Sequence, residues 1–350
     1  MRSQAHDSLT RRLPRHRLAL VALASCALLA ACGGGGGDDK GDPVTPLSQS
    51  DATADAANAS STGSDTAAAL DTLVDTATAL APVLAATAAA SPERARVESA
   101  RPETTPAAPS ISGTVACPGG GTATMTVIGG SLELLRNGQL DLGEDYKVTY
   151  AQCSGGAGLA KLDGSVEMVV TAADRASSPS SVAVNLTVTH LVLSLPAGDA
   201  TLAGSATLSR SVATTGGTTT TTSHVSVPSA TLATAFNSRT GSFTLSDLDA
   251  TRVVTSVDGV TTASQYNGHH TLAGTAWGRT FSMTVATTGN VDRDANGTLV
   301  SGAWTVVRPH ATVATTIANG LAVITVDDGN DGTIDHTWTF PAAQLAAAAG

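Results

Sequence analysis

From about residue 110 onward, short runs of alternating apolar and polar residues are separated by dipeptides that favour tight turns. In one such run, Val182, Val184, Leu186 and Val188 alternate with small or polar residues. Asn-Gly and Asp-Gly between alternating segments are strong short-range signals for β-hairpins. The candidate turns are Asn137-Gly138, Asp163-Gly164, Gly216-Gly217, Asp258-Gly259, Asn267-Gly268, Asn296-Gly297, Asn319-Gly320 and Asp331-Gly332.

No segment between these turns has the pattern of a long amphipathic helix, and parallel strands would need such crossovers. The sequence therefore predicts a mainly β fold over residues 110–341, an antiparallel meander of about 14 to 18 short strands. A sheet this wide must curl, close or divide into two layers. Because Thr and Ser fill most outward positions, we expect one wet face and a strongly curved sheet or partial barrel. A two-sheet sandwich is the alternative.

One helix is predicted before the β region, over residues 65–90. Leu70, Leu73, Val74 and Leu80 recur at helical spacing. Ser64 or Asp65 can cap its start, and Pro82 should break or kink it near residue 81. The stripe is apolar but thin and rich in alanine, so we expect the helix to pack against the concave side of the sheet.

The segments around this helix are poor in large apolar side chains. Residues 32–64 consist mainly of Gly, Asp, Ser, Ala and Thr, and such a composition predicts a disordered tether. Residues 91–109 contain four prolines and are predicted to form a second linker. Residues 342–350 are an alanine-rich tail.

The N-terminus has the organisation of an export signal. Four arginines between positions 11 and 17 precede an apolar core from Leu18 to Leu29, which is too short to span a bilayer permanently. The sequence Leu29-Ala30-Ala31-Cys32 resembles the lipobox of bacterial lipoproteins. The resemblance implies that residues 1–31 are a cleaved signal peptide and that Cys32 carries fatty acyl groups such as palmitate. An ordinary cleaved secretory signal or an uncleaved anchor is the alternative.

The same resemblance implies a location. Among Gram-negative lipoproteins, an aspartate after the acylated cysteine is associated with retention in the inner membrane, and this chain has Gly33 there. The expected place is the cell envelope, anchored through Cys32 in the outer membrane of a Gram-negative bacterium. The block from Gly113 to Thr171, with Gly143-Glu144-Asp145 before Tyr150-Ala151-Gln152-Cys153, is similar to β-rich proteobacterial lipoproteins of unknown function.

Charge excludes one class of partner. Without residues 1–31 the chain keeps 14 basic and 28 acidic residues, a net charge of −14. A chain this acidic repels phosphate backbones, so no nucleic acid is expected as a partner. The expected partners are the lipid bilayer, through acylated Cys32, and an envelope protein, glycan or lipid.

Two cysteines remain after the predicted signal, Cys117 and Cys153. In an oxidising compartment an even pair is most simply a disulfide, and two buried free thiols are the alternative.

One local motif could bind a cation. Asp292, Asp294 and Asn296 followed by Gly297 form the Asp-x-Asp-x-Asn-Gly opening of a calcium loop. A complete loop ends in a bidentate glutamate at its twelfth position, which here is Ala303. A polar hairpin tip without a metal is the alternative, and no other cofactor is expected.

Candidate catalytic groups are scattered. His269 and His270 are adjacent, so on a strand they face opposite ways and cannot share an ion without a bulge. We find no motif typical of a hydrolase or of a phosphate-binding loop. The sequence thus favours a non-catalytic anchored protein with a binding or structural role, in which the curved sheet holds an apolar ligand. The alternatives are a hydrolase of envelope polymers with dispersed catalytic residues and a calcium-stabilised interaction module.

Overall fold

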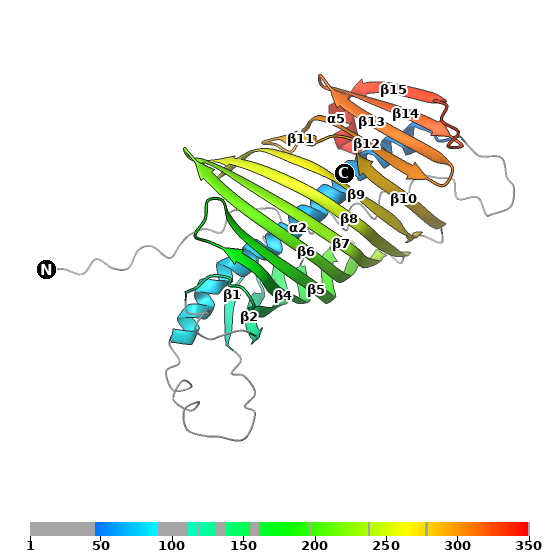
Figure 1. The fold of residues 1–350 in the computed structure, drawn as a ribbon. Helices are drawn as coiled ribbons and strands as arrows, with labels where there is room; N and C mark the ends of the chain where they lie inside the picture. The colour runs from blue at the N-terminus through cyan, green and yellow to red at the C-terminus, as the bar shows by residue number, and fades with distance from the viewer. Residues whose placement is uncertain are drawn as a thin grey trace.

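The computed structural model describes residues 46–89, 111–117, 119–129, 137–154, 161–195, 198–236, 239–276 and 279–348. Within these residues the chain forms one antiparallel sheet of 15 strands and two helices (Figure 1). The helices are α2 (Gln49–Ala89) and α5 (Ala342–Ala348). The strands are β1 (Ser112–Ala116), β2 (Thr122–Gly129), β3 (Asp145–Ser154), β4 (Lys161–Asp174), β5 (Ser180–Leu195), β6 (Gly198–Thr215), β7 (Thr218–Phe236), β8 (Arg239–Val257), β9 (Val260–Ala276), β10 (Arg279–Thr287), β11 (Val291–Asp294), β12 (Leu299–Arg308), β13 (Ala311–Ala318), β14 (Leu321–Asp328) and β15 (His336–Pro341).

The sheet is a meander, as predicted. Its strands follow one another from β1 to β15, and only the short β11 leaves this order to pair with both β9 and β12. The sheet is strongly curved around α2 (Figure 1), so the curved single sheet is correct and the two-sheet sandwich is not.

Helix α2 runs opposite to the order of the strands. At its start, the Leu47 amide donates a hydrogen bond of 3.0 Å to Asp328 of β14. Along its length α2 contacts β14, β13, β12, β9, β8 and β7, and it also contacts β2 and β1 (Figure 1). Its 41 residues span about 60 Å at 1.5 Å per residue. One helix therefore supports almost the whole width of the sheet.

The prediction of short strands is wrong for the middle of the sheet, where β5 to β9 are 16 to 19 residues long. One reason is that Asp163-Gly164 and Asn267-Gly268 lie inside β4 and β9 and are not turns. A Cβ on Gly164 would lie 2.1 Å from the carbonyl oxygen of His190, and one on Gly268 would lie 2.6 Å from that of Asp249. These glycines allow close approach of the neighbouring strand.

The prediction that residues 32–64 form a disordered tether is wrong from Gln49 onward, because α2 begins there and not at residue 65. Ser48 caps the start: its Oγ accepts the amide of Asp51 at 3.2 Å and donates to the Asp51 carboxylate at 2.6 Å. Alanine side chains provide the contact with the sheet, since Ala52, Ala56 and Ala57 are fully buried. Small side chains let this helix lie close to the strands.

The helix also continues past Pro82 to Ala89. The predicted alanine-rich tail is helical as α5, which packs against α2 and buries Leu345 completely. The predicted signal peptide, Cys32 and the linker at 91–109 lie outside the described residues.

The core lies between α2 and the concave face of the sheet. A stretch of α2 is apolar and long enough to cross a membrane, but 64% of it is buried inside the protein. Trp304, the largest fully buried side chain, donates its indole N–H to the carbonyl oxygen of Ala56 at 3.0 Å. Cys117 and Cys153 form the predicted disulfide between the segment after β1 and the end of β3, with their Cα atoms 5.4 Å apart.

Candidate functional site

The two flanks of α2 differ in chemistry. Asp71 and Leu73 are two residues apart, which places their side chains about 200° apart around the helix axis. The flank with Asp71 carries carboxylates that pair with arginines of the sheet. The flank with Leu73 lines an apolar hollow.

Arginines from β12, β11, β8 and β6 meet α2 along its length, and those that pair with Asp71 and Asp75 lie on the polar flank. Arg308 of β12 pairs with Asp55, and Arg293 of β11 donates to the Ser60 carbonyl oxygen at 3.1 Å. Further along the helix, Asp71 accepts a hydrogen bond of 3.0 Å from Arg252 of β8 and one of 2.5 Å from the Ser223 hydroxyl of β7; Asp75 pairs with Arg210 of β6. This arginine ladder fixes α2 along the concave face.

Burial dominates the electrostatics of these carboxylates. It raises the pKa of Asp55 to about 6, against the opposing effect of the Arg308 charge. Burial also raises the pKa of Asp71, despite the hydrogen bond from Ser223 and the charge of Arg252. The pKa of Asp65 is raised for the same reason, and burial lowers the pKa of nearby Arg293. The pairs hold α2 in place, but desolvation opposes their contribution to stability.

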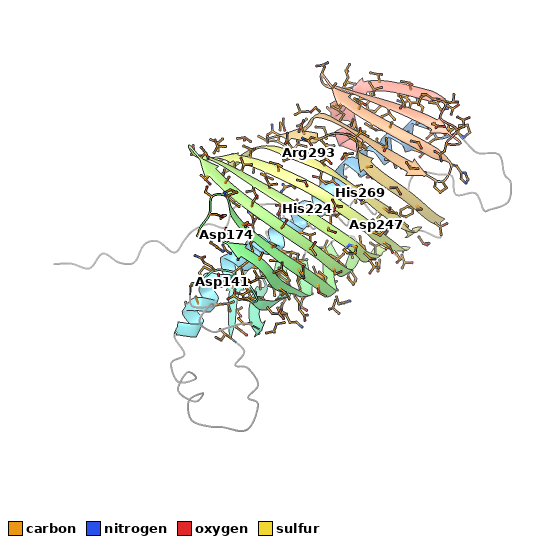
Figure 2. All side chains as sticks on the ribbon, in the orientation of Figure 1. Asp141, Asp174, His224, Asp247, His269 and Arg293 are labelled. Carbon is orange, nitrogen blue, oxygen red and sulfur yellow. A yellow bond between two sulfur atoms is a disulfide. The ribbon has the colours of Figure 1, made fainter. Side chains whose placement is uncertain are left out.

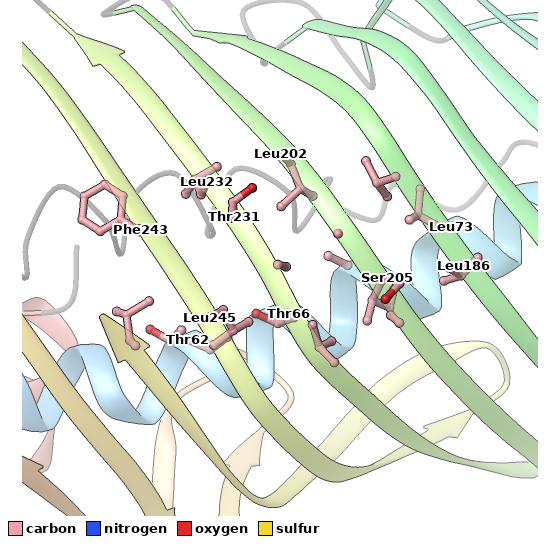
Figure 3. Close-up of a pocket in the computed structure, with 18 residues that line it drawn as sticks. Thr62, Thr66, Leu73, Leu186, Leu202, Ser205, Thr231, Leu232, Phe243 and Leu245 are labelled. Carbon is pink, nitrogen blue, oxygen red and sulfur yellow. The ribbon is translucent and has the colours of Figure 1, made fainter. Parts of the chain in front are cut away.

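On the opposite flank, an apolar groove lies between α2 and the inner face of β5 to β9 (Figure 3). Its cavity volume is about 80 Å³. Leu202, Leu232 and Leu272 in its wall are only partly buried, so the groove is open to solvent along one side. The lining residues are Thr62, Thr66, Ala69, Leu70, Leu73, Leu186, Val188, Leu202, Gly204, Ser205, Ala206, Val227, Ala230, Thr231, Leu232, Phe243, Leu245 and Leu272.

The hydroxyl groups that α2 contributes to the groove are already satisfied. Thr62 donates its hydroxyl to the Asn58 carbonyl oxygen at 2.9 Å, and Thr66 donates to that of Thr62 at 2.7 Å. On the sheet side, the hydroxyl of Thr231 donates to the Ala203 carbonyl oxygen at 3.4 Å. With these hydroxyls turned to the backbone, and with no charged residue in the lining, the groove offers hydrocarbon contacts to whatever occupies it.

The pairing between neighbouring strands is irregular near the groove. The register shifts between β5 and β6 next to Val188, between β6 and β7 next to Ser205, and between β8 and β9 next to Ser246. Bulges bend strands and increase their local twist. We attribute the groove to this bend.

Next to the groove, Gly63 allows the closest contact between α2 and the sheet. A Cβ at this position would lie 1.9 Å from the hydroxyl oxygen of Tyr266 and 3.2 Å from Nδ1 of His270. Both of these polar atoms are buried, and neither has a hydrogen-bond partner among the residues that the structure describes. Burial lowers the pKa of His270 to about 4, so its imidazole is neutral at pH 7. As predicted for adjacent strand residues, His269 is exposed on the other face.

The predicted calcium ligands lie near one another along the chain, but each has other partners. Asp294 accepts the amides of Thr298 and Asn296, both at 2.9 Å, and these bonds lower the pKa of its carboxyl. Asp292 Oδ2 accepts the hydroxyl of Ser301, which belongs to β12. Asp294, Asn296 and Gly297 thus form a hairpin tip. Within the described ranges no group of three His, Cys, Asp or Glu side chains is placed to hold a metal ion.

Titratable residues on the outer face are spread over neighbouring strands, with His224 on β7, Asp247 on β8 and His269 on β9 (Figure 2). The nearest pair is His224 Nε2 with the Asp249 carboxylate at 3.3 Å, and about half of each side chain is exposed. This pair lies on the opposite face from the groove, and neither residue belongs to its lining.

Sequence reasoning missed the arginine ladder, and it expected the groove only in general form, as an apolar ligand on a curved sheet. The sequence does contain a signal for the arginine ladder. Arg210, Arg252 and Arg308 stand at alternate positions that are otherwise apolar in their strands, for example in Trp304-x-Val306-x-Arg308. An arginine on the apolar, buried face of a strand needs an anionic partner that is also buried. The groove has a weaker signal, since its position depends on the register shifts.

Comparisons with known proteins give no further guidance: no known family matches the chain, and neither a curated protein nor a solved structure is significantly similar to it.

Proposed function

We propose that this chain is a lipoprotein of the bacterial cell envelope that has a non-catalytic role and holds an apolar ligand in the groove beside α2. The groove is the observation that carries the binding part of this proposal. It combines a wholly uncharged lining, three threonine hydroxyls that donate to backbone carbonyl oxygens, and partial access from solvent. Ligand sites are typically concave and mostly apolar, and this groove has both properties.

The anchoring part rests on the lipobox-like sequence that ends at Cys32. Leu47 is fifteen positions after Cys32, and a chain of that length reaches at most about 50 Å. The sheet would therefore remain near the membrane surface that anchors it, the outer membrane being the expected one. Two or more acyl chains hold a protein stably, whereas one chain binds only marginally.

The anchor is tested with Cys32→Ser. We expect the wild-type chain to be processed before residue 32, to have the mass of an acylated product and to partition into detergent. The variant should retain the full mass of the unprocessed chain or be cut elsewhere, without acyl groups. Equal masses and equal detergent partition for the two proteins would disprove the anchor and leave the groove untouched.

Ligand binding is tested with a pair of substitutions on β7. Ala230→Phe fills the groove, because Ala230 belongs to its lining. Ala233→Phe adds the same bulk to the exposed face of the same strand and is the matched control. The complete proteins are purified from membranes, their thermal unfolding is compared, and bound lipid is extracted and measured by mass spectrometry.

We expect lipid bound to the wild type and to Ala233→Phe, and at least tenfold less on Ala230→Phe when its unfolding temperature is unchanged. Equal lipid on all three proteins would assign that lipid to the outer surface. No lipid on any of them, even after incubation with fatty acid, would exclude the proposed binding role.

A further inference from the structure

The shape of the groove carries an inference that rests on the proposed function and makes it more specific. We propose that the groove binds a single unbranched acyl chain of medium length from an envelope lipid, and that Phe243 forms the end wall that limits the length of this chain.

The floor of the groove is formed by small residues that lie side by side on neighbouring strands. A Cβ on Gly204 of β6 would lie 2.7 Å from both Cα and Cβ of Ala230 on β7, so no side chain fits at position 204. Ala206 and Ala69 continue this small surface along β6 and α2. The walls of the groove are the larger side chains of leucine and valine.

The volume selects the class of ligand. A cavity needs about 10–15 Å³ by this measure to hold one water. The 80 Å³ of the groove therefore has room for about five to eight groups of the size of a water molecule or a methylene group, which corresponds to the inner part of one acyl chain. Because the lining is uncharged, the polar head group of the lipid stays outside, at the side that is open to solvent.

The length of the groove follows from the strands that it crosses. Leu186, Leu202, Leu232 and Phe243 belong to β5, β6, β7 and β8 and lie in that order along the groove (Figure 3). These four strands cover about 14 Å at a spacing of about 4.8 Å, and Leu272 of β9 packs beside Phe243 at this end of the groove. An acyl chain of medium length fits this distance, and a long one does not.

Phe243 is held firmly enough to act as a wall. Its side chain is only 3% exposed, and its ring lies 5.6 Å from that of Phe281, measured between the ring centres. On the other side, a Cβ on Gly241 would lie 2.9 Å from the ring, so Gly241 allows the ring to occupy this place. Replacement by alanine would extend the groove toward Phe281.

The test measures chain-length preference in the complete protein, extracted in cholate. Laurate and palmitate are added in equal amounts, and their adducts are counted by native mass spectrometry. We expect one laurate per wild-type chain, in at least tenfold preference over palmitate. In Phe243→Ala this preference should fall about tenfold or reverse, because added methylene groups gain burial beyond the former wall.

Phe340→Ala is the matched control, since Phe340 is a buried phenylalanine of β15 outside the groove, and its preference should equal that of the wild type. If laurate and palmitate bind equally to wild type and Phe243→Ala, the end wall is disproved while the proposed binding function stands. If neither acid binds to the wild type, both proposals fail.

Discussion

Arg252 Nη1 lies 3.0 Å from Oδ2 of Asp71, and this ion pair joins the middle of α2 to β8 where the Asp71 side chain is only 9% exposed. The same carboxylate accepts the hydroxyl of Ser223 from β7. Two neighbouring strands are thus attached to one helical residue, on the flank of α2 that faces away from the apolar groove.

Asp71→Asn should lower the free energy of unfolding by about 2–4 kcal/mol, because it leaves the Arg252 charge partly buried without its partner. Urea denaturation measures this change. Asp75→Asn is the control: its side chain is 54% exposed, so its pair with Arg210 should contribute less than about 1 kcal/mol. Equal losses in the two variants would show that burial does not determine the strength of the ladder.

Gly63→Ala should destabilise the protein by about 1–3 kcal/mol, because the added methyl group overlaps the Tyr266 hydroxyl. This sign is unusual, since Gly→Ala inside a helix normally stabilises by up to about 1 kcal/mol. Adding Tyr266→Phe should recover only part of the loss, because the ring carbon Cζ would still lie 2.6 Å from the new Cβ. A stabilised Gly63→Ala protein would mean that α2 is not pressed against β9.

The neutral, buried His270 should make the protein sensitive to acid. Its pKa is about 4 in the folded state and 6.5 in a model peptide, so the unfolded chain binds more protons between these values. Stability from this group is fully present above pH 6.5 and is lost as the pH falls toward 4, by about 3 kcal/mol in total.

His270→Gln should remove this contribution, so the wild type should lose stability relative to the variant between pH 6.5 and 4. The comparison must be a difference, because the raised pKa of Asp55 acts in the opposite direction between pH 3.8 and about 6. Urea midpoints and slopes at several pH values give the result. Parallel pH profiles for the two proteins would contradict the assignment.

Removal of the disulfide, by Cys117→Ser with Cys153→Ser, should lower the free energy of unfolding. The two cysteines are 36 positions apart, and a loop of that length corresponds to about 4 kcal/mol in the chain-entropy treatment. Thermal and urea unfolding of the double variant measure the loss. Each single variant should lose at least as much as the double, and an unchanged double variant would rule out any contribution from the bond.

The sequence predicted the sheet well because its signals are local. Alternation and the turn dipeptides specify antiparallel hairpins, and positive φ values at Asp258-Gly259 and Asn319-Gly320 agree with the turn type that such dipeptides favour. The same dipeptides mislead at Gly164 and Gly268, where the demand for glycine comes from a neighbouring strand. That demand is tertiary and leaves no mark in a short window of sequence.

The start of α2 was missed for a different physical reason. Helix prediction depended on large apolar residues, whereas the segment after Gln49 buries alanines. The Ser48-x-x-Asp51 cap was present as a signal and was not used. The groove was expected only in general form, as an apolar ligand on a curved sheet, because its location depends on the register shifts in β5 to β9.

The direction of α2 has a mechanical consequence. The helix enters the fold at β14, through the Leu47–Asp328 contact, and lies across the strands almost as far as β1. A pull applied at the N-terminal end of α2 is therefore directed along the helix axis, and many ion pairs and side-chain contacts resist it together in shear. A protein held by its N-terminus gains from this arrangement, because tension cannot peel the strands away one after another.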